Sequence, residues 1–265
     1  MELSLSQIIL LAVVQGLTEF LPVSSSGHLV IVAKFLVPSG SPRSLDITDL
    51  NIVLHAGTLV SIWIVYFRRI AKLLGEDRRL VGRLALATIP AVLVGIPLKI
   101  FADDRVMANP LLAGCLLIVT GSLLLVTVRF PPGKTECRDI SYRQAFLIGL
   151  SQAVAILPGL SRSGATISTG LGLGLKPASA TTFSFLMAIP VIGGASLMGL
   201  VSQMGESEKL TTPVFHLFVG ASVSCLVGLA ALLCLIRWIE RGKLQWFAVW
   251  CIPLGIVVVA WQLAS

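Results

Sequence analysis

The chain has 265 residues, of which 55% are hydrophobic and only 12% are charged, and its mean hydropathy is +0.93. These values exclude an ordinary soluble domain and predict an integral membrane protein. The net charge of +7 does not indicate a nucleic-acid partner, because the basic residues lie in short loops without interleaved aromatic residues. The five cysteines form no CxxC pair and are expected mostly as small buried residues.

The N-terminal stretch MELSLSQ lacks the basic start and the small-residue cleavage site of a signal peptide. The first apolar run is therefore expected to stay in the mature protein. Further along, six segments approach the length of about 20 apolar residues that a membrane span needs. They are residues 51–67, 84–101, 110–128, 180–204, 215–236 and 246–263.

Lysine and arginine are distributed unevenly among the loops between these segments. Residues 68–83 contain six, 129–143 four and 237–243 three, whereas 99–105 contain two and 205–213 only Lys209. By the positive-inside rule, the first three loops are cytoplasmic and the last two lie outside. Arg78 and Lys134 are thus expected inside, and Asp103 and Lys209 outside.

Two polar stretches interrupt the apolar pattern, QGLTEFLPVSSSGH at 15–28 and SQAVAILPGLSRSGAT at 151–166. Four residues of the first recur 137 positions later: Gln15, Ser24, Ser26 and Gly27 match Gln152, Ser161, Ser163 and Gly164. Each stretch runs from an apolar helix through Leu-Pro to a serine-rich turn. The loop charges require the second stretch to begin and end inside, which an even number of crossings or a re-entrant hairpin would satisfy. The proline and glycine breaks favour the hairpin.

The predicted fold is therefore all-α, a single polytopic membrane domain spanning 1–265. It contains two inverted repeats, 1–140 and 141–265, each with one re-entrant broken helical hairpin plus three transmembrane helices. Polar and charged side chains are costly in hydrocarbon unless they face a protein-lined cavity. The two polar stretches together are thus the predicted functional site.

On a helix, Gln15 and Glu19 lie at i and i+4 and share one face before the break at Pro22. Such a pair suits a divalent cation that shares its ligands with a phosphate. The turn after Pro22 offers hydroxyls, backbone N–H groups and the His28 imidazole, a combination that suits an anion. A helix cap would need only one of the hydroxyls. The anion-binding residues of this turn are Ser24, Ser25, Ser26 and Gly27.

His28 is the histidine nearest these serines and is the natural base for a serine nucleophile. His55 and His216, near the ends of their segments, are expected at the membrane interface, with lining of the cavity as the less favoured alternative for His55. In the second stretch Arg162 can bind phosphate oxygens bidentately. Structural pairing with Glu19 is the alternative role for this arginine, but the surrounding hydroxyls favour phosphate. Those hydroxyls belong to Ser161, Ser163 and Thr166.

Together these motifs resemble the signatures of the bacterial undecaprenyl-diphosphate phosphatases, the bacitracin-resistance family of the cell envelope. The resemblance covers essentially the whole chain. It implies dephosphorylation of a C55 polyprenyl diphosphate to the monophosphate, which recycles the lipid carrier of wall synthesis. It also implies a divalent cation, Mg²⁺ or Ca²⁺, and a site that opens to the outer face of the inner membrane. The matching positions are Gln15 and Glu19, Ser25 and His28, and Arg162. Glutamine at position 15 removes one of the two carboxylates that could bind the metal.

The residues and the resemblance predict in-line attack by Ser25 on the terminal phosphorus, with His28 accepting the proton. Arg162 and the turn amides would stabilise the equatorial oxygens, and Glu19 would hold or orient the cation. Direct activation of water by His28 uses the same residues, and attack by another serine also stays open. The expected partners are the lipid diphosphate and membrane lipid, with a homodimer as a further hypothesis.

A lipid-phosphate flippase or anion transporter is the alternative function, since inverted repeats with broken helices are typical of alternating access. The Ser-His pair favours the phosphatase, because transport does not need a nucleophile.

Overall fold

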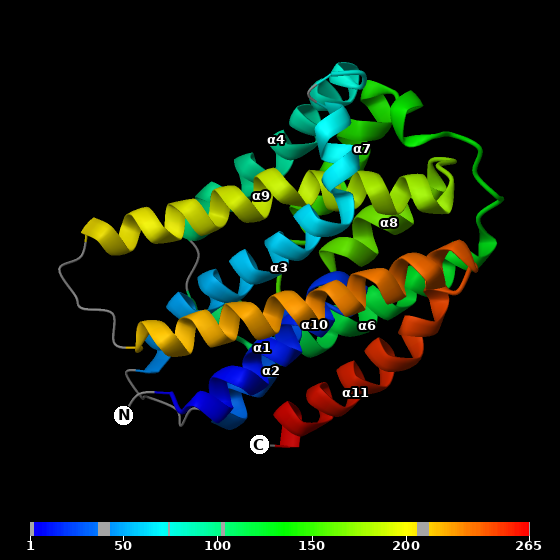
Figure 1. Ribbon diagram of the computed structural model, residues 1–265. Coiled ribbons are helices and arrows are strands. Elements are labelled where there is room, and N and C mark those ends of the chain that lie inside the picture. The colour runs from blue at the N-terminus through cyan, green and yellow to red at the C-terminus, as the bar shows by residue number, and fades with distance from the viewer. Residues whose placement is uncertain (1–2, 37–42, 74, 102–103, 206–211, 265) are drawn as a thin grey trace.

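A computed structural model describes residues 3–36, 43–73, 75–101, 104–205 and 212–264, and these residues are almost entirely helical (Figure 1). The α-helices are α1 (Leu5–Phe20), α2 (Ser25–Leu36), α3 (Arg43–Leu73), α4 (Arg78–Phe101), α5 (Asp104–Met107), α6 (Pro110–Val126), α7 (Tyr142–Val154), α8 (Arg162–Gly172), α9 (Pro177–Gly205), α10 (Val214–Glu240) and α11 (Ala248–Ala264). Three short 3-10 helices complete the set: η1 (Thr127–Arg129), η2 (Cys137–Asp139) and η3 (Leu244–Phe247). The all-α class predicted from composition is confirmed.

Within the described residues, six helical segments are long and apolar enough to cross a membrane: Leu50–Leu73, Arg78–Leu98, Pro110–Arg129, Pro177–Gly199, Val214–Glu240 and Leu244–Ala264. They coincide with the six predicted spans, and several extend into the charged loops because Lys and Arg side chains are tolerated at helix ends. The two polar stretches form the short pairs α1/α2 and α7/α8, each broken at a turn as predicted. Asp103 and Lys209, which the loop charges placed outside, lie beyond the described residues.

Both broken pairs begin with the same reciprocal cap. Ser4 Oγ accepts from Gln7 N at 3.3 Å, and Gln7 Oε1 accepts from Ser4 N at 2.9 Å. Ser141 and Gln144 repeat this arrangement at 3.2 and 2.8 Å. A capping box satisfies two N–H groups that a helix start otherwise leaves unpaired. The start of each hairpin is thus fixed by two residues of its own sequence.

The two halves of the chain are interleaved. α1 packs against α10, α7 against α4, and α6 against α11, while α3 and α9 also lie in contact. Glycines permit the closest approaches: a Cβ on Gly16 would lie 2.8 Å from the Ser224 carbonyl oxygen, and one on Gly149 would overlap the backbone of Ala87. Each hairpin therefore depends on a span of the other half for its packing.

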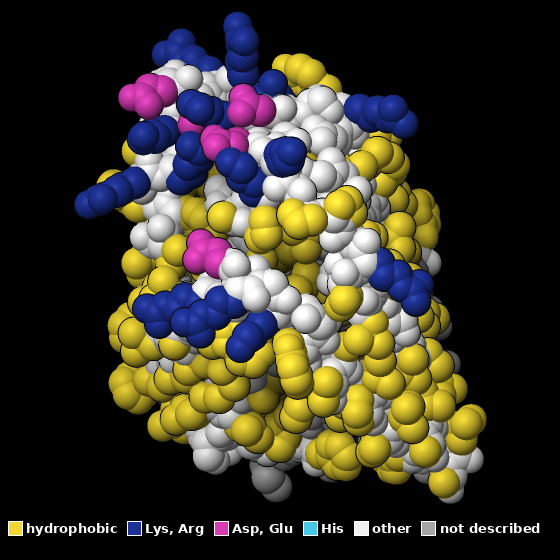
Figure 2. All heavy atoms as spheres, turned by 90° about the vertical axis from the view of Figure 1, so that its right-hand side faces the viewer, with side chains coloured by type: hydrophobic (Ala, Val, Ile, Leu, Met, Phe, Trp, Pro, Cys, Tyr) yellow, Lys and Arg dark blue, Asp and Glu magenta, His cyan; other side chains and the backbone are white. Residues whose placement is uncertain are grey.

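In Figure 1, α3, α6 and α10 run towards the upper-right end of the molecule, whereas α4, α9 and α11 run away from it. The connections from α3 to α4, α6 to α7 and α10 to α11 all lie at that end. They include the three loops rich in Lys and Arg. Figure 2 shows Lys and Arg side chains gathered at the top of this face and in a second group at mid-height, with hydrophobic side chains between and below them. Corresponding helices of the two halves thus run in opposite directions, and the inverted repeat itself stays a prediction.

Candidate active site

The first polar turn is held against the second by the hydroxyl of Ser24. Ser24 is the one non-glycine residue in the described part of the chain with a positive φ, 70°. Its Oγ accepts from Gly27 N at 3.3 Å, which caps α2, and from Gly159 N at 3.1 Å in the other hairpin. A Cβ on Gly27 would lie 2.9 Å from Gly159 Cα, so a larger residue at 27 would separate the turns. One hydroxyl and two glycines lock the two turns together.

The second turn is anchored to α6 by Thr120. Thr120 Oγ1 donates to the Gly159 carbonyl at 2.8 Å and accepts from Ser161 N at 3.0 Å. Ser161 Oγ in turn accepts from Gly164 N at 3.1 Å and caps α8. Ser24 and Ser161, both predicted to bind phosphate, therefore also serve as helix caps, the structural role weighed for these serines. Their position at helix starts follows directly from that role.

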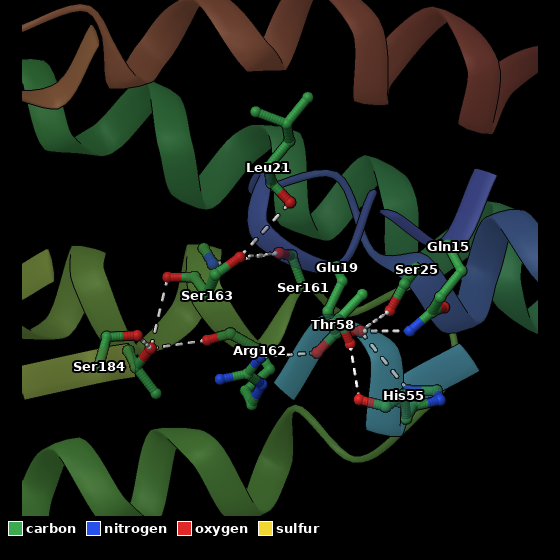
Figure 3. A network of polar contacts seen from close by, with 12 residues as sticks. Gln15, Glu19, Leu21, Ser25, His55, Thr58, Ser161, Arg162, Ser163 and Ser184 are labelled. Atoms are coloured by element: carbon green, nitrogen blue, oxygen red, sulfur yellow. Dashed lines mark hydrogen bonds and ion pairs between the residues drawn. The ribbon is translucent and has the colours of Figure 1, made fainter. Parts of the chain in front are cut away.

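Glu19, at the end of α1, is where the two hairpins meet (Figure 3). Its Oε2 accepts from Ser25 Oγ at 2.7 Å and from Gln15 Nε2 at 3.1 Å, and its Oε1 accepts from Arg162 Nη2 at 2.7 Å. Ser25 is the first residue of α2 and Arg162 the first residue of α8. The two short helices thus direct their first side chains at one carboxylate. The pair of Glu19 and Arg162 is buried, with side chains 5% and 14% exposed.

His55 joins this cluster from α3, so its ring faces the site, which was the less favoured of the two expectations from the sequence. Its Nε2 lies 3.5 Å from Glu19 Oε2, and its Nδ1 lies 2.8 Å from the carbonyl oxygen of Asn51. α3 extends well beyond the predicted apolar segment, from Arg43 to Leu73. His55 is consequently one turn or more inside the helix, where its ring faces the carboxylate (Figure 3).

His28 points away from Ser25, and the two form no hydrogen bond. Trp250 Nε1 donates to His28 Nε2 at 2.9 Å, and His28 Nδ1 lies 2.8 Å from the Ser24 carbonyl oxygen. Because an indole N–H only donates and a carbonyl only accepts, the ring is the neutral tautomer with its proton on Nδ1. The predicted pair of His28 and Ser25 is therefore not present, and the hydroxyl donates to Glu19 instead.

A cavity of about 590 Å³ opens beside the cluster. The predicted residues that line it are Glu19, Ser24, Ser25, Ser26, Ser161 and Arg162, whereas Gln15, Gly27, His28, Ser163 and Thr166 do not. Thr166 Oγ1 lies 2.6 Å from Ser184 Oγ and donates to the Arg162 carbonyl at 2.8 Å, so its hydroxyl is engaged within the protein. The structure thus brings Glu19, Ser25 and Arg162 together at the cavity, beside three further predicted serines, whereas the other five predicted residues do not line it.

The fit of a divalent cation rests on Glu19 and Gln15. Among the described residues, no group of three or more His, Cys, Asp or Glu side chains could hold a metal ion. Glu19 is the one carboxylate among the described residues that line the cavity, and Arg162 already neutralises it. Gln15 Oε1, however, is buried without a partner and is free to accept or to coordinate. These two residues fit an ion that takes its remaining ligands from phosphate, not a resident metal held by protein alone.

Two further polar groups in the cavity have no partner. Gln152, on α7, lines the cavity with both amide atoms unpaired, and Arg162 Nη1 is unpaired as well. The sequence showed Gln152 as the repeat of Gln15 without assigning it a function. An orphaned buried amide is the structural signal that marks it.

An apolar groove of about 540 Å³ adjoins the cavity. α3, α4 and α9 form its walls, and Val92 and Pro190 line both spaces. Other groove residues include Trp63, Leu84, Ile89 and Leu186. The polar cluster therefore continues into a hydrophobic path between membrane-spanning helices.

Comparison with known proteins links this chain to a family. The family model described as "Bacitracin resistance protein BacA" matches residues 8–257. A protein of Rhodopirellula baltica named undecaprenyl-diphosphatase is 45% identical over 255 residues, covering 96% of this chain and 97% of its own. Proteins of the same name from Desulforudis audaxviator and Bacteroides thetaiotaomicron are 38% and 36% identical, each over at least 95% of both chains.

Proposed function

We propose that this chain, which belongs to the bacitracin resistance protein BacA family, hydrolyses undecaprenyl diphosphate to undecaprenyl monophosphate and inorganic phosphate. The activity would recycle the lipid carrier of cell-wall synthesis and confer bacitracin resistance. One observation carries the proposal: a serine, a carboxylate and an arginine from the two hairpins meet within 2.7 Å contacts beside a cavity that continues into an apolar groove.

Ser25 is the proposed nucleophile and Glu19 the proposed base. The Ser25 hydroxyl already donates to Glu19 Oε2 at 2.7 Å, within the reach that proton transfer needs. Ser25 Oγ forms a bond to the terminal phosphorus, and the bond to the bridging oxygen breaks, so the prenyl monophosphate leaves with the electron pair. Water then attacks the phosphoserine, releases phosphate and restores the hydroxyl. His28 acts through the turn, by holding the Ser24 carbonyl that precedes the nucleophile.

Arg162 is proposed to stabilise the transferred phosphoryl group. Its Nη2 is bound to Glu19 while its Nη1 has no partner, so the guanidinium can bind phosphate without leaving the carboxylate. The first turns of α2 and α8 lie on either side of the same cluster. Helix N-termini carry partial positive charge, which favours the charge that spreads over the equatorial oxygens.

A divalent cation, Mg²⁺ or Ca²⁺, is proposed to arrive with the diphosphate. Glu19 and the unpaired Gln15 Oε1 are the residues that would hold it. Bound there, the ion would neutralise phosphate charge and orient the substrate. We further propose that the protein lies in the bacterial inner membrane as a multi-pass enzyme, with its basic loops in the cytoplasm and its cavity open to the outer face.

The alternative, a lipid-phosphate flippase or anion transporter, explains the paired hairpins but not the serine that donates to a buried carboxylate. Phosphate release by the purified, detergent-solubilised protein from undecaprenyl diphosphate, with and without a chelator, separates the two. We expect one phosphate per diphosphate and loss of activity with chelator. No release under any ion condition would favour the transporter, and release unaffected by chelator would remove the cation from the proposal.

A further inference from the structure

Gln152 is buried beside the cavity, and its side-chain amide has no hydrogen-bond partner. Its residue is 1% exposed, and neither Nε2 nor Oε1 has a hydrogen-bond partner. Its counterpart Gln15 bonds to Glu19 four residues on, but the residue four positions after Gln152 is Ile156. The second helix therefore offers the amide no local partner, and a ligand in the cavity is the partner that remains.

An unpaired buried amide costs about 1–3 kcal/mol, and such groups are rare unless they await a ligand or an ordered water. The same cavity contains a second unpaired donor, Arg162 Nη1. Two donors without acceptors are complementary to a ligand that is rich in oxygen acceptors, as a diphosphate is. The terminal torsion of a glutamine is broad, so a small rotation turns its N–H groups into the cavity.

The position of Gln152 indicates which of the two phosphates it contacts. Ser25 and Glu19 fix the terminal phosphorus at one side of the cavity. Gly149, on α7, lies against Ala87 of α4, and Gln152 three residues on shares that helix face. α4 also carries Val92, which lines both the cavity and the apolar groove. Gln152 is thus on the side where the lipid tail must leave the cavity.

We propose that Gln152 binds the phosphate that remains on the lipid, while the prenyl chain passes Val92 and Pro190 into the groove between α3, α4 and α9. Arg162, whose Nη2 is bound to Glu19, would bind the terminal phosphate on the nucleophile's side. The proposal rests on the proposed phosphatase function. Gln152 then holds the leaving group and places the scissile bond in line with Ser25.

Binding of the two products tests this assignment without turnover. We would measure the affinities of farnesyl monophosphate and of inorganic phosphate, by ligand-induced thermal stabilisation in detergent, for wild type and Gln152→Met. Methionine keeps the shape and removes the amide. We expect Gln152→Met to weaken farnesyl monophosphate binding about 10- to 100-fold, as for a lost hydrogen bond to a charged group, and to leave phosphate binding unchanged.

Ser168→Ala is the matched control, because Ser168 Oγ is also buried and unpaired but does not line the cavity. Neither variant should lower the Tm, since replacing an unpaired polar group by an apolar one is neutral or stabilising. A drop in Tm for Gln152→Met, or unchanged monophosphate affinity, would overturn the inference. A loss confined to phosphate would assign Gln152 to the terminal group instead. Absence of phosphate release by wild type would refute the phosphatase function, whereas this inference alone falls if wild type is active and both affinities are unaltered.

Discussion

The ion pair between Glu19 and Arg162 makes a quantitative prediction, because it joins the two hairpins and is nearly buried. Glu19→Gln leaves the Arg162 guanidinium without its counter-charge. Arg162→Met leaves the Glu19 carboxylate without its main counter-charge. Removing one partner of a buried pair costs about 3–5 kcal/mol. At about 2–4 °C per kcal/mol for a chain of this size, each single variant should lose on the order of 10 °C in Tm.

The double variant Glu19→Gln, Arg162→Met contains no unpaired charge from this pair. We therefore expect its Tm to lie above that of either single variant, although all three should be inactive. The control is the exposed pair of Lys176 and Glu136. Lys176 Nζ lies 2.9 Å from Glu136 Oε1, and both side chains are 46% exposed. Surface pairs contribute about 0.2–1 kcal/mol, so the same double substitution there should show little coupling.

For each pair, thermal unfolding in detergent is measured for wild type, the two single variants and the double variant. The Tm values give the coupling between the two partners of each pair. If the Tm losses at Glu19 and Arg162 simply add in the double variant, the pair does not hold the hairpins together. The geometry would then describe two independent contacts.

Four other changes have definite expected outcomes. Ser25→Ala should lower kcat about 100- to 10,000-fold, measured by phosphate release, because the nucleophile and its base act as one unit. Its loss of Tm should be smaller than that of Glu19→Gln, since it removes one hydrogen bond to the carboxylate and no charge; retention of the rate would transfer the attack to water or another serine. Arg162→Lys should be nearly as inactive as Arg162→Ala, since an ammonium cannot bind Glu19 and phosphate with separate planar donors; kcat within about threefold of wild type would contradict this. Gly159→Ala should lower Tm and yield of folded protein, because φ is +97° there and a Cβ would overlap the Ala113 carbonyl. Lys134→Cys in a cysteine-free background should react with an impermeant thiol reagent only after permeabilisation, and labelling of intact spheroplasts would reverse the topology.

Much of the fold follows from the sequence because hydrocarbon imposes strict requirements. Six apolar segments became six candidate spans, and the proline and glycine breaks became the turns of two short helix pairs. Glu19, Ser25 and Arg162 were predicted as one site, since charged groups in a membrane need one another or a ligand. The capping boxes at Ser4 and Ser141 were not predicted, although a serine followed three residues later by glutamine is a sequence pattern that satisfies the first N–H groups of a helix.

The direction of each imidazole could not be predicted. His28 is three residues after Ser25, which suggests contact, but its ring bonds to Trp250 in the last helix, 222 residues away in sequence. His55 reaches Glu19 only because α3 packs beside the hairpin. Rotamers of this kind depend on tertiary neighbours, and periodicity within one segment contains no information about them. The isolation of Gln152 likewise becomes visible only when every neighbour is placed.

The interleaving of the halves has a consequence for biogenesis. α1 packs on α10 and α6 packs on α11. At a synthesis rate of about 5–20 residues per second, the roughly 190 residues between α1 and α10 delay the partner of α1 by about 10–40 s. During that interval the buried Glu19 and Gln15 lack the protein surface that shields them in the finished fold. The first hairpin must therefore wait in the insertion machinery or at the bilayer surface, and completion of the last two helices is the step that commits the nascent chain to its native state.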